Sequence, residues 1–151
     1  MTSPRSSKYR FPPSRATIHM GSDGVRSEVT AGGHSLTVDE PERAGGSDAG
    51  PTPFHLLAAS LGSCTTITLR MYADRKGWPL EKVEARVEYQ PSIPRRRGEA
   101  DDGDPCRFHM ELELTGPLEP AQRERLLEIA HRCPIHRTLA GHAVVQLTEA
   151  R

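Results

Sequence analysis

The stretch PFHLLAASLGSCTTITLRMYADRKG, residues 53–77, decides the fold of this chain because it predicts the longest element. Pro53 suits the first turn of a helix, and no other proline interrupts the run before Gly77 and Pro79 end it. We therefore expect a helix over residues 54–76, about 35 Å long. A stripe at helical spacing contains Leu57, Leu61, Cys64, Thr68 and Met71. Because other apolar residues extend this surface, we expect the helix to be largely buried, with its N-terminal part innermost.

Shorter elements are predicted on both sides of this helix. Runs with alternating or β-branched residues, separated by glycine and proline turns, predict strands at residues 16–20, 25–31, 34–39, 80–90, 108–114 and 143–148. Amphipathic spacing predicts two further helices at residues 120–131 and 134–141. The order contains hairpins and no βαβ repeat, so we expect an α+β fold with an antiparallel sheet around the long helix.

The length of 151 residues fits one domain. Residues 1–15 are rich in Ser, Pro and Arg, so we expect a flexible tail followed by a single domain over residues 16–151. Apolar residues make up 35% and aromatic residues 5% of the chain, which predicts a thin core in a monomer. Burial between subunits would add stability, so we expect an oligomer.

The net charge and the N-terminal segment indicate which partners and which cellular location the protein is expected to have. Lys plus Arg and Asp plus Glu are equal at 20 each, so no net field favours nucleic acid or an anionic membrane. The basic N-terminus lacks a following apolar segment, and no run approaches the length of a membrane span. Three cysteines are too few for the disulfide framework of a secreted domain. We expect a cytoplasmic protein.

Two of the three cysteines are candidates for chemistry. Cys64 lies on the apolar stripe, where an inert core thiol is the simpler interpretation. Cys133 precedes Pro134 at the expected N-cap of a helix, where backbone N–H groups favour a thiolate, and basic residues are near in sequence. The residues alone thus favour Cys133 as the more acidic thiol. Cys106, at the edge of a polar loop, is interpreted as structural.

Histidines and cysteines together leave a metal site as an alternative. His55, expected in the first helical turn, is by itself an ordinary surface residue with one polar edge in water. Soft and borderline ligands for Zn²⁺ are present at His55, Cys64, His131, Cys133 and His136. Only Cys133 and His136 form a short-spaced pair, whereas zinc sites usually have two. We therefore expect no metal ion.

Two motifs together carry a resemblance to a known family. GPTPFHLLAASLGSCTTITLRMYADRKG, residues 50–77, and CPIHRTLAG, residues 133–141, resemble the OsmC/Ohr superfamily. The segment DEPERAGGSDAGP, residues 39–51, resembles the loop before the helix in one cytosolic branch. The resemblance covers about two thirds of the chain. It implies the OsmC-like fold and an intertwined homodimer with its active sites at the subunit interface.

The same resemblance implies a thiol peroxidase that reduces organic hydroperoxides without a cofactor. Cys64 would be the peroxidatic thiol and Cys133 the resolving thiol, and an external dithiol would reduce the disulfide between them. The resemblance thus implies that Cys64 attacks the hydroperoxide, whereas the N-cap position of Cys133 predicts that Cys133 has the lower pKa. An apolar pocket lined by Leu57, Leu61 and Met71 would suit an alkyl or lipid hydroperoxide.

One departure from the family pattern leaves a second function open. Family members use an Arg to hold the thiolate and a first-turn Glu to orient that Arg. Arg26 is our candidate for the Arg, in preference to Arg15. Phe54 and His55 occupy the first turn, and a neutral imidazole accepts a hydrogen bond without supplying a negative charge. The alternative is a redox sensor or small-ligand-binding protein that keeps the fold.

Overall fold

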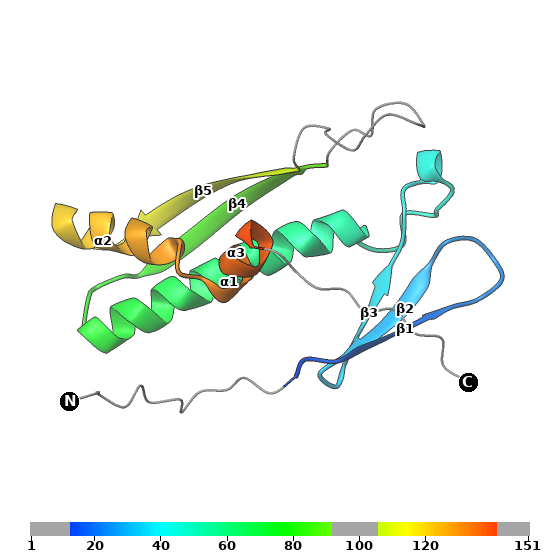
Figure 1. Ribbon diagram of the computed structural model, residues 1–151, viewed down its shortest axis with the longest axis horizontal. Coiled ribbons are helices and arrows are strands. Elements are labelled where there is room, and N and C mark those ends of the chain that lie inside the picture. The colour runs from blue at the N-terminus through cyan, green and yellow to red at the C-terminus, as the bar shows by residue number, and fades with distance from the viewer. Residues whose placement is uncertain (1–12, 92–105, 142–151) are drawn as a thin grey trace. The chain divides into compact units, whose positions relative to one another are not determined.

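The computed structural model of the chain describes residues 13–91 and 106–141 (Figure 1). The chain divides into two compact units, Met1–Pro53 and Phe54–Arg151. The prediction of a single domain over residues 16–151 stays a prediction, as does the tail, most of which lies outside the described residues. Within those residues, no helix is long and apolar enough to cross a membrane.

The first unit contains a three-stranded antiparallel sheet. Its strands are β1 (Ala16–Met20), β2 (Ser27–Ala31) and β3 (His34–Val38), in the order β1-β2-β3. Gly32 and Gly33 connect β2 to β3 with φ angles of 57° and 81°, which a tight hairpin turn requires and glycine adopts readily. The predicted meander is therefore confirmed, with β2 starting two residues later than expected.

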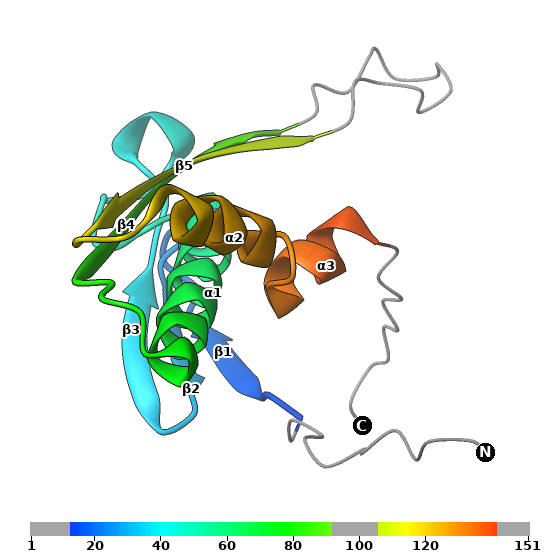
Figure 2. The same cartoon turned by 90° about the vertical axis from the view of Figure 1, so that its left-hand side faces the viewer.

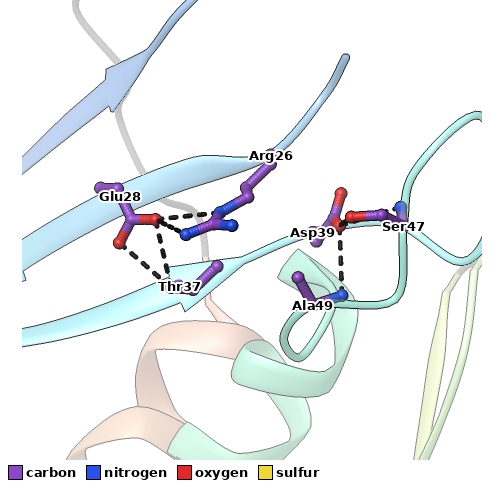
Figure 3. A network of polar contacts seen from close by, with 6 residues as sticks. All are labelled: Arg26, Glu28, Thr37, Asp39, Ser47 and Ala49. Carbon is purple, nitrogen blue, oxygen red and sulfur yellow. Dashed lines mark hydrogen bonds and ion pairs between the residues drawn. The ribbon is translucent and has the colours of Figure 1, made fainter. Parts of the chain in front are cut away.

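A compact loop follows β3 and leads to the long helix. It contains the 3₁₀ turn η1 (Glu42–Ala44) and is organised around the Asp39 carboxylate, which is 1% exposed. That carboxylate accepts hydrogen bonds from the Ser47 hydroxyl at 2.7 Å and from the backbone N–H groups of Glu40, Ser47 and Ala49 at 2.8, 3.0 and 3.2 Å (Figure 3). Led by the bonds from Ser47, they lower the pKa of Asp39 to about 2, against the opposing effect of burial.

The loop around Asp39 requires glycine at one close approach. A Cβ atom on Gly46 would lie 1.8 Å from the backbone oxygen of Glu40 and 2.7 Å from a carboxylate oxygen of Asp39. The sequence predicted only an irregular, glycine-punctuated loop here. The structure shows a segment fixed by one buried carboxylate.

The second unit is built on α1 (Pro53–Lys76), which begins at the proline that the sequence indicates. Strands β4 (Lys82–Gln90) and β5 (Arg107–Thr115) form an antiparallel hairpin, and α2 (Pro120–Ala130) and α3 (Pro134–Ala140) follow. Figures 1 and 2 show the hairpin running alongside α1, with α3 beside the middle of that helix. The hairpin comes close to α1 at Gly62, where an added Cβ would be 3.1 Å from the Val87 side chain.

The register of the hairpin confirms the predicted alternation. Pairs on one face are Val83 with Leu114, Ala85 with Leu112, Val87 with Met110 and Tyr89 with Phe108. Arginines fix its base: Arg70 of α1 donates to the Leu80 and Glu81 carbonyls, and Arg123 of α2 donates to the Leu114 and Gly116 carbonyls. The hairpin is thereby held to both helices.

The core of the second unit lies towards the C-terminal half of α1. Its buried residues are Leu69, Ala73, Leu80, Leu118, Leu126, Ile129 and Ala130. This differs from the predicted stripe, because Met71 is 66% exposed whereas Leu69 and Ala73 are fully buried. Apolar residues lie on several sides of α1, so periodicity did not indicate which side α2 and the hairpin cover.

The predicted α+β class with antiparallel pairing is confirmed, and the described strands form two sheets, one of three strands and one of two. The predicted strand over residues 143–148 lies outside the described residues, as does most of the loop over residues 91–105. The helix predicted over residues 120–131 ends one residue earlier, at Ala130.

Candidate dithiol site

The candidate site joins the middle of α1 to the junction between α2 and α3. Cys64 is half-buried, and Cys133 is completely buried. Cys133 is the N-cap of α3, with φ −54° and ψ 131°, and Pro134 starts the helix. Its N–H donates to the Ala130 carbonyl at 3.2 Å, so a tight turn after α2 directs the cysteine inward.

The structure brings these two cysteines together from distant parts of the chain. Both are unbridged thiols, and they are close enough to interact through hydrogen bonding. A dithiol that can exchange protons between its sulfurs, in a site largely shielded from water, is equipped for reversible disulfide chemistry.

Donor groups around Cys133 favour its thiolate. Burial acts in the opposite direction, but interactions with the Cys64 thiol, the backbone N–H of His136, the Thr65 hydroxyl and the N–H of Ile135 lower the pKa of Cys133 overall. The Cys133 side chain makes no capping hydrogen bond at the start of α3.

Cys64 has the opposite tendency. Burial raises the pKa of its thiol, and the neighbouring Cys133 raises it further. The N–H of Ile135 and the Thr68 hydroxyl oppose this rise. The coupled pair therefore has its more acidic sulfur at Cys133, in the direction that the local sequence argument predicted. The lowering comes from the Cys64 thiol and from hydrogen-bond donors that include the backbone N–H groups named by the sequence argument, and no basic side chain is among its causes.

Two threonines near the sulfurs were missed by sequence reasoning. Thr65 is completely buried and its hydroxyl donates to the Leu61 carbonyl at 2.9 Å. Thr68 donates to the Cys64 carbonyl at 2.7 Å. A threonine hydroxyl bonded to the previous helical turn is common, so these two residues do not stand out from other helical threonines. The available signal was a polar residue directly after Cys64 on a helix predicted to be buried.

A groove lies beside the turn that carries Cys133. It has a volume of about 300 Å³ and is lined by Met110, Leu112, Leu127, Ala130, His131 and His136. The two histidine rings meet edge to face, with centroids 5.3 Å apart. The apolar lining of this groove suits an alkyl group, although its residues are not those that the sequence predicted for a pocket.

His55 lies elsewhere on the same unit. It lines a second groove of about 420 Å³ between α1 and β4, together with Ala58, Ala59, Gly62, Ser63, Thr66, Ala85 and Val87. This groove lies on the face of α1 that is turned towards the hairpin. His55 therefore lines this groove with small side chains of α1 and β4, and neither Cys64 nor Cys133 is among the residues that line it.

Arg26 belongs to the first compact unit, directly before β2. Its guanidinium donates two hydrogen bonds to one carboxylate oxygen of Glu28, from Nη2 at 2.8 Å and from Nε at 3.1 Å (Figure 3). The Thr37 hydroxyl also lies within hydrogen-bonding distance of both oxygens of Glu28. The Arg26 bond, followed by that from Thr37, lowers the pKa of Glu28. Sequence reasoning missed Glu28 as a partner of Arg26.

The alternative of a zinc site gains no support from the part of the chain that the structure describes. No three His, Cys, Asp or Glu side chains are grouped there so that they could hold a metal ion. His55 lines the groove towards β4, whereas His131 and His136 line the groove beside α2.

The fold and this site together define an α+β protein with a shielded pair of thiols. A family model described as OsmC-like protein matches residues 45–148. The chain therefore belongs to the OsmC-like family, and the predicted resemblance is confirmed. A search of curated proteins found no match.

Solved structures share the fold. The OsmC-like protein of Mycoplasma pneumoniae is 21% identical over 86% of this chain and 89% of that chain, with a TM-score of 0.69. The organic hydroperoxide resistance protein OsmC of Legionella pneumophila is 22% identical over 88% and 93%, with a TM-score of 0.65. The organic hydroperoxide resistance protein OhrB of Bacillus subtilis is 19% identical over 85% and 91%, with a TM-score of 0.56.

Proposed function

We propose that this protein is a thiol peroxidase that reduces organic hydroperoxides through Cys64 and Cys133. The observation that carries the proposal is the interacting pair of unbridged thiols, one half-buried and one fully buried. Membership of the OsmC-like family supports it. So do the names of two structural neighbours, which are described as organic hydroperoxide resistance proteins.

The proposed cycle has three steps. The Cys64 thiolate attacks the terminal oxygen of the hydroperoxide, the O–O bond breaks, and the alkoxide leaves as an alcohol after taking a proton. The Cys133 thiolate then attacks the sulfur of the Cys64 sulfenic acid, so that an S–S bond forms, the S–O bond breaks and water leaves after protonation. An external dithiol reduces the disulfide and is itself oxidised to a disulfide.

The roles of the two sulfurs follow from access. Cys64 is half-buried and therefore the sulfur that a hydroperoxide reaches, whereas Cys133 is fully buried. A buried thiol with a lowered pKa is suited to attack an intermediate that forms beside it. The lower pKa of Cys133 is thus compatible with a resolving role.

Burial raises the pKa of the Cys64 thiol, so a cation that stabilises its thiolate would favour the reaction. From the family pattern, in which an Arg holds the thiolate, we assign that role to Arg26. Glu28 holds its guanidinium and supplies a carboxylate in place of the first-turn Glu that other family members use. In this proposal His55, in the first turn of α1, has no part in the chemistry.

The proposal includes a homodimer. Large apolar side chains of α1 are exposed on the single chain, with Phe54, Ile67 and Met71 at 53%, 58% and 66%. All five residues of β1 are exposed as well, including Ile18 and Met20. Such surfaces on a chain with a small core favour association with a second copy. Analytical ultracentrifugation tests this directly, and a monomer at micromolar concentration contradicts it.

The peroxidase assay uses cumene hydroperoxide with dithiothreitol or dihydrolipoamide as the dithiol. Cys64→Ser is expected to reduce turnover to the uncatalysed background, and Cys106→Ser, which removes the exposed thiol, is the matched control with full turnover. Unchanged turnover in Cys64→Ser would refute the proposal.

A redox sensor is the second candidate, and the raised pKa of Cys64 favours it because a thiol of raised pKa is mostly protonated and attacks slowly. The peroxidase assay described above also distinguishes a sensor from an enzyme. A sensor forms the Cys64–Cys133 disulfide once and reverses slowly, with a negligible steady-state rate.

A further inference from the structure

The C-terminal end of α1 carries a tyrosine that is surrounded by positive charge. The Tyr72 ring is partly buried and packs edge to face against Trp78, with ring centroids 5.5 Å apart. The Arg75 guanidinium carbon lies 5.3 Å from the centroid of the Tyr72 ring, and the Lys76 Nζ lies 5.9 Å from it. From α2, the Nε of Arg125 donates a hydrogen bond to the Tyr72 hydroxyl at 3.3 Å. Two helices thus bring three cations to one phenol, and these four side chains form the Tyr72 cluster, Tyr72, Arg75, Lys76 and Arg125.

Hydrogen-bond donors of the Tyr72 cluster remain available to a ligand. A phenol that accepts a hydrogen bond still has its own proton to donate, and the described residues supply no acceptor for that proton of Tyr72. Arg125 pairs with Glu128 through Nη1, and its Nη2 has no partner within the same part of the chain. Asp74, next to the cluster, pairs with Arg70 instead. Among the described residues, one carboxylate therefore faces three cations.

The cations of the cluster also act on the phenol. The hydrogen bond from Arg125 lowers the pKa of Tyr72, and the charges of Arg125, Lys76 and Arg75 lower it further, against the opposing effect of burial. An environment that stabilises negative charge on the phenol oxygen also stabilises an anion bound beside it. The distances and the charges thus favour the same kind of ligand.

We infer that the Tyr72 cluster is a binding site for a small phosphate ester in its dianionic form. The terminal oxygens of such an ester are strong acceptors, so they suit the Tyr72 O–H and the Nη2 of Arg125. Arg75 and Lys76 supply the remaining positive charge. Tyr72 follows Cys64 by about 12 Å along the axis of α1, so this site is separate from the dithiol and does not depend on the proposed function.

The competing explanation is that the cations serve the helix alone. Arg75 and Lys76 lie in the last turn of α1, where cations interact favourably with the helix dipole, and their aliphatic stems can cover the Tyr72 ring. That role needs neither the phenol proton nor Arg125 of α2. Tyr72→Phe distinguishes the two explanations, because it keeps the ring and removes only the hydroxyl.

The test uses the fluorescence of Trp78, which is the only tryptophan in the chain and contacts the Tyr72 ring. The full chain is titrated with inorganic phosphate slightly above neutral pH, where the anion is mostly doubly charged, and at constant ionic strength. A saturable change is expected in the millimolar range. In Tyr72→Phe the half-saturating concentration is expected to rise about tenfold, the size of one charge-assisted hydrogen bond.

Further variants make the result independent of a single substitution. The double variant Arg75→Gln with Lys76→Gln changes only exposed side chains and is expected to weaken phosphate binding as well. Arg86→Gln is the matched control, because Arg86 is an exposed arginine of the hairpin that also pairs with a glutamate, Glu84, and its half-saturating concentration is expected to stay unchanged.

Three results would overturn the inference. The first is the absence of a saturable response to phosphate in the natural chain. The second is a half-saturating concentration that is the same in the natural chain, in Tyr72→Phe and in the double variant. The third is a response to vesicles of anionic phospholipid without any response to free phosphate, which would assign the cluster to a membrane surface.

Discussion

Asp39 in the first compact unit and Cys133 in the second are both buried and ionisable, and in both cases a neighbouring hydroxyl and backbone N–H groups lower the pKa. Around Asp39 the hydrogen bonds are short, and its pKa falls to about 2, so the carboxylate is permanently charged at neutral pH. Around Cys133 the neighbouring Cys64 thiol acts together with such donors against burial, and the pKa is lowered from a much higher reference value.

Similar donors thus produce a structural anchor at Asp39 and a reactive group at Cys133. The carboxylate is already ionised in water, so hydrogen bonds fix it and the surrounding loop. The thiol is mostly neutral in water, so the same kinds of bond change how often the reactive form is present. Changes near Asp39 should therefore alter stability, and changes near Cys133 should alter reactivity.

The largest effect is expected at the thiols. In Cys133→Ser the sulfenic acid on Cys64 has no resolving partner, so peroxide turnover with a dithiol reductant should fall steeply while unfolding is little changed. Trapping with dimedone after one equivalent of hydroperoxide, followed by mass spectrometry, should find the label on Cys64. A label on Cys106 instead would contradict the proposed roles.

The next effect is expected in the Asp39 loop. Gly46→Ala places a Cβ atom in collision with the Glu40 carbonyl, and the free energy of unfolding should fall by about 1–3 kcal/mol, as for overpacked sites. Urea denaturation measures this. Gly21→Ala is the control, because nothing lies within 4 Å of the added atom. If Gly46→Ala instead changed the acidity of Cys133 in the folded protein, the assignment of the Asp39 loop to stability alone would be wrong.

The stability contributed by Asp39 should also depend on pH. The folded pKa of Asp39 is lowered from 3.8 to about 2, so its contribution is present above about pH 4 and is lost as pH falls towards 2. Urea midpoints measured across this window should decline more for the natural chain than for Asp39→Asn. An equal decline in the two proteins would show that Asp39 does not anchor the loop.

The smallest effect is expected from Thr68, whose hydroxyl is the least of the influences named for Cys64. Thr68→Val should raise the pKa of Cys64 and reduce its thiolate fraction by a few-fold, less than a full charged hydrogen bond. Cys133→Ser with Cys106→Ser is the background, and thiolate absorbance is the measurement. An unchanged titration of Cys64 in Thr68→Val would contradict this influence of the Thr68 hydroxyl.

Much of the fold could be predicted from the sequence because its signals are local. Pro53 and Gly77 bound α1, and the alternation around Val83 and Leu112 fixes the hairpin register. The buried side of α1 could not be predicted, since Met71 and Leu69 are both apolar and only the docking of α2 and the hairpin distinguishes them.

The candidate site was predictable in part. Cys64 and Cys133 were found through their motifs, and the N-cap position of Cys133 gave the direction of its pKa. Thr65 and Glu28 were not found, because their significance depends on tertiary neighbours or on a side-chain rotamer. The hydrogen bond from Ser47 to Asp39 likewise could not be predicted, because it depends on the conformation of the intervening loop.

The most direct test of the proposed dithiol chemistry is a thiol count with peptide mapping after one equivalent of cumene hydroperoxide, without reductant. The chain has three cysteines, and two thiols are expected to disappear, with a peptide linked between Cys64 and Cys133 and an unmodified Cys106. Three remaining thiols, or a disulfide that includes Cys106, would contradict it.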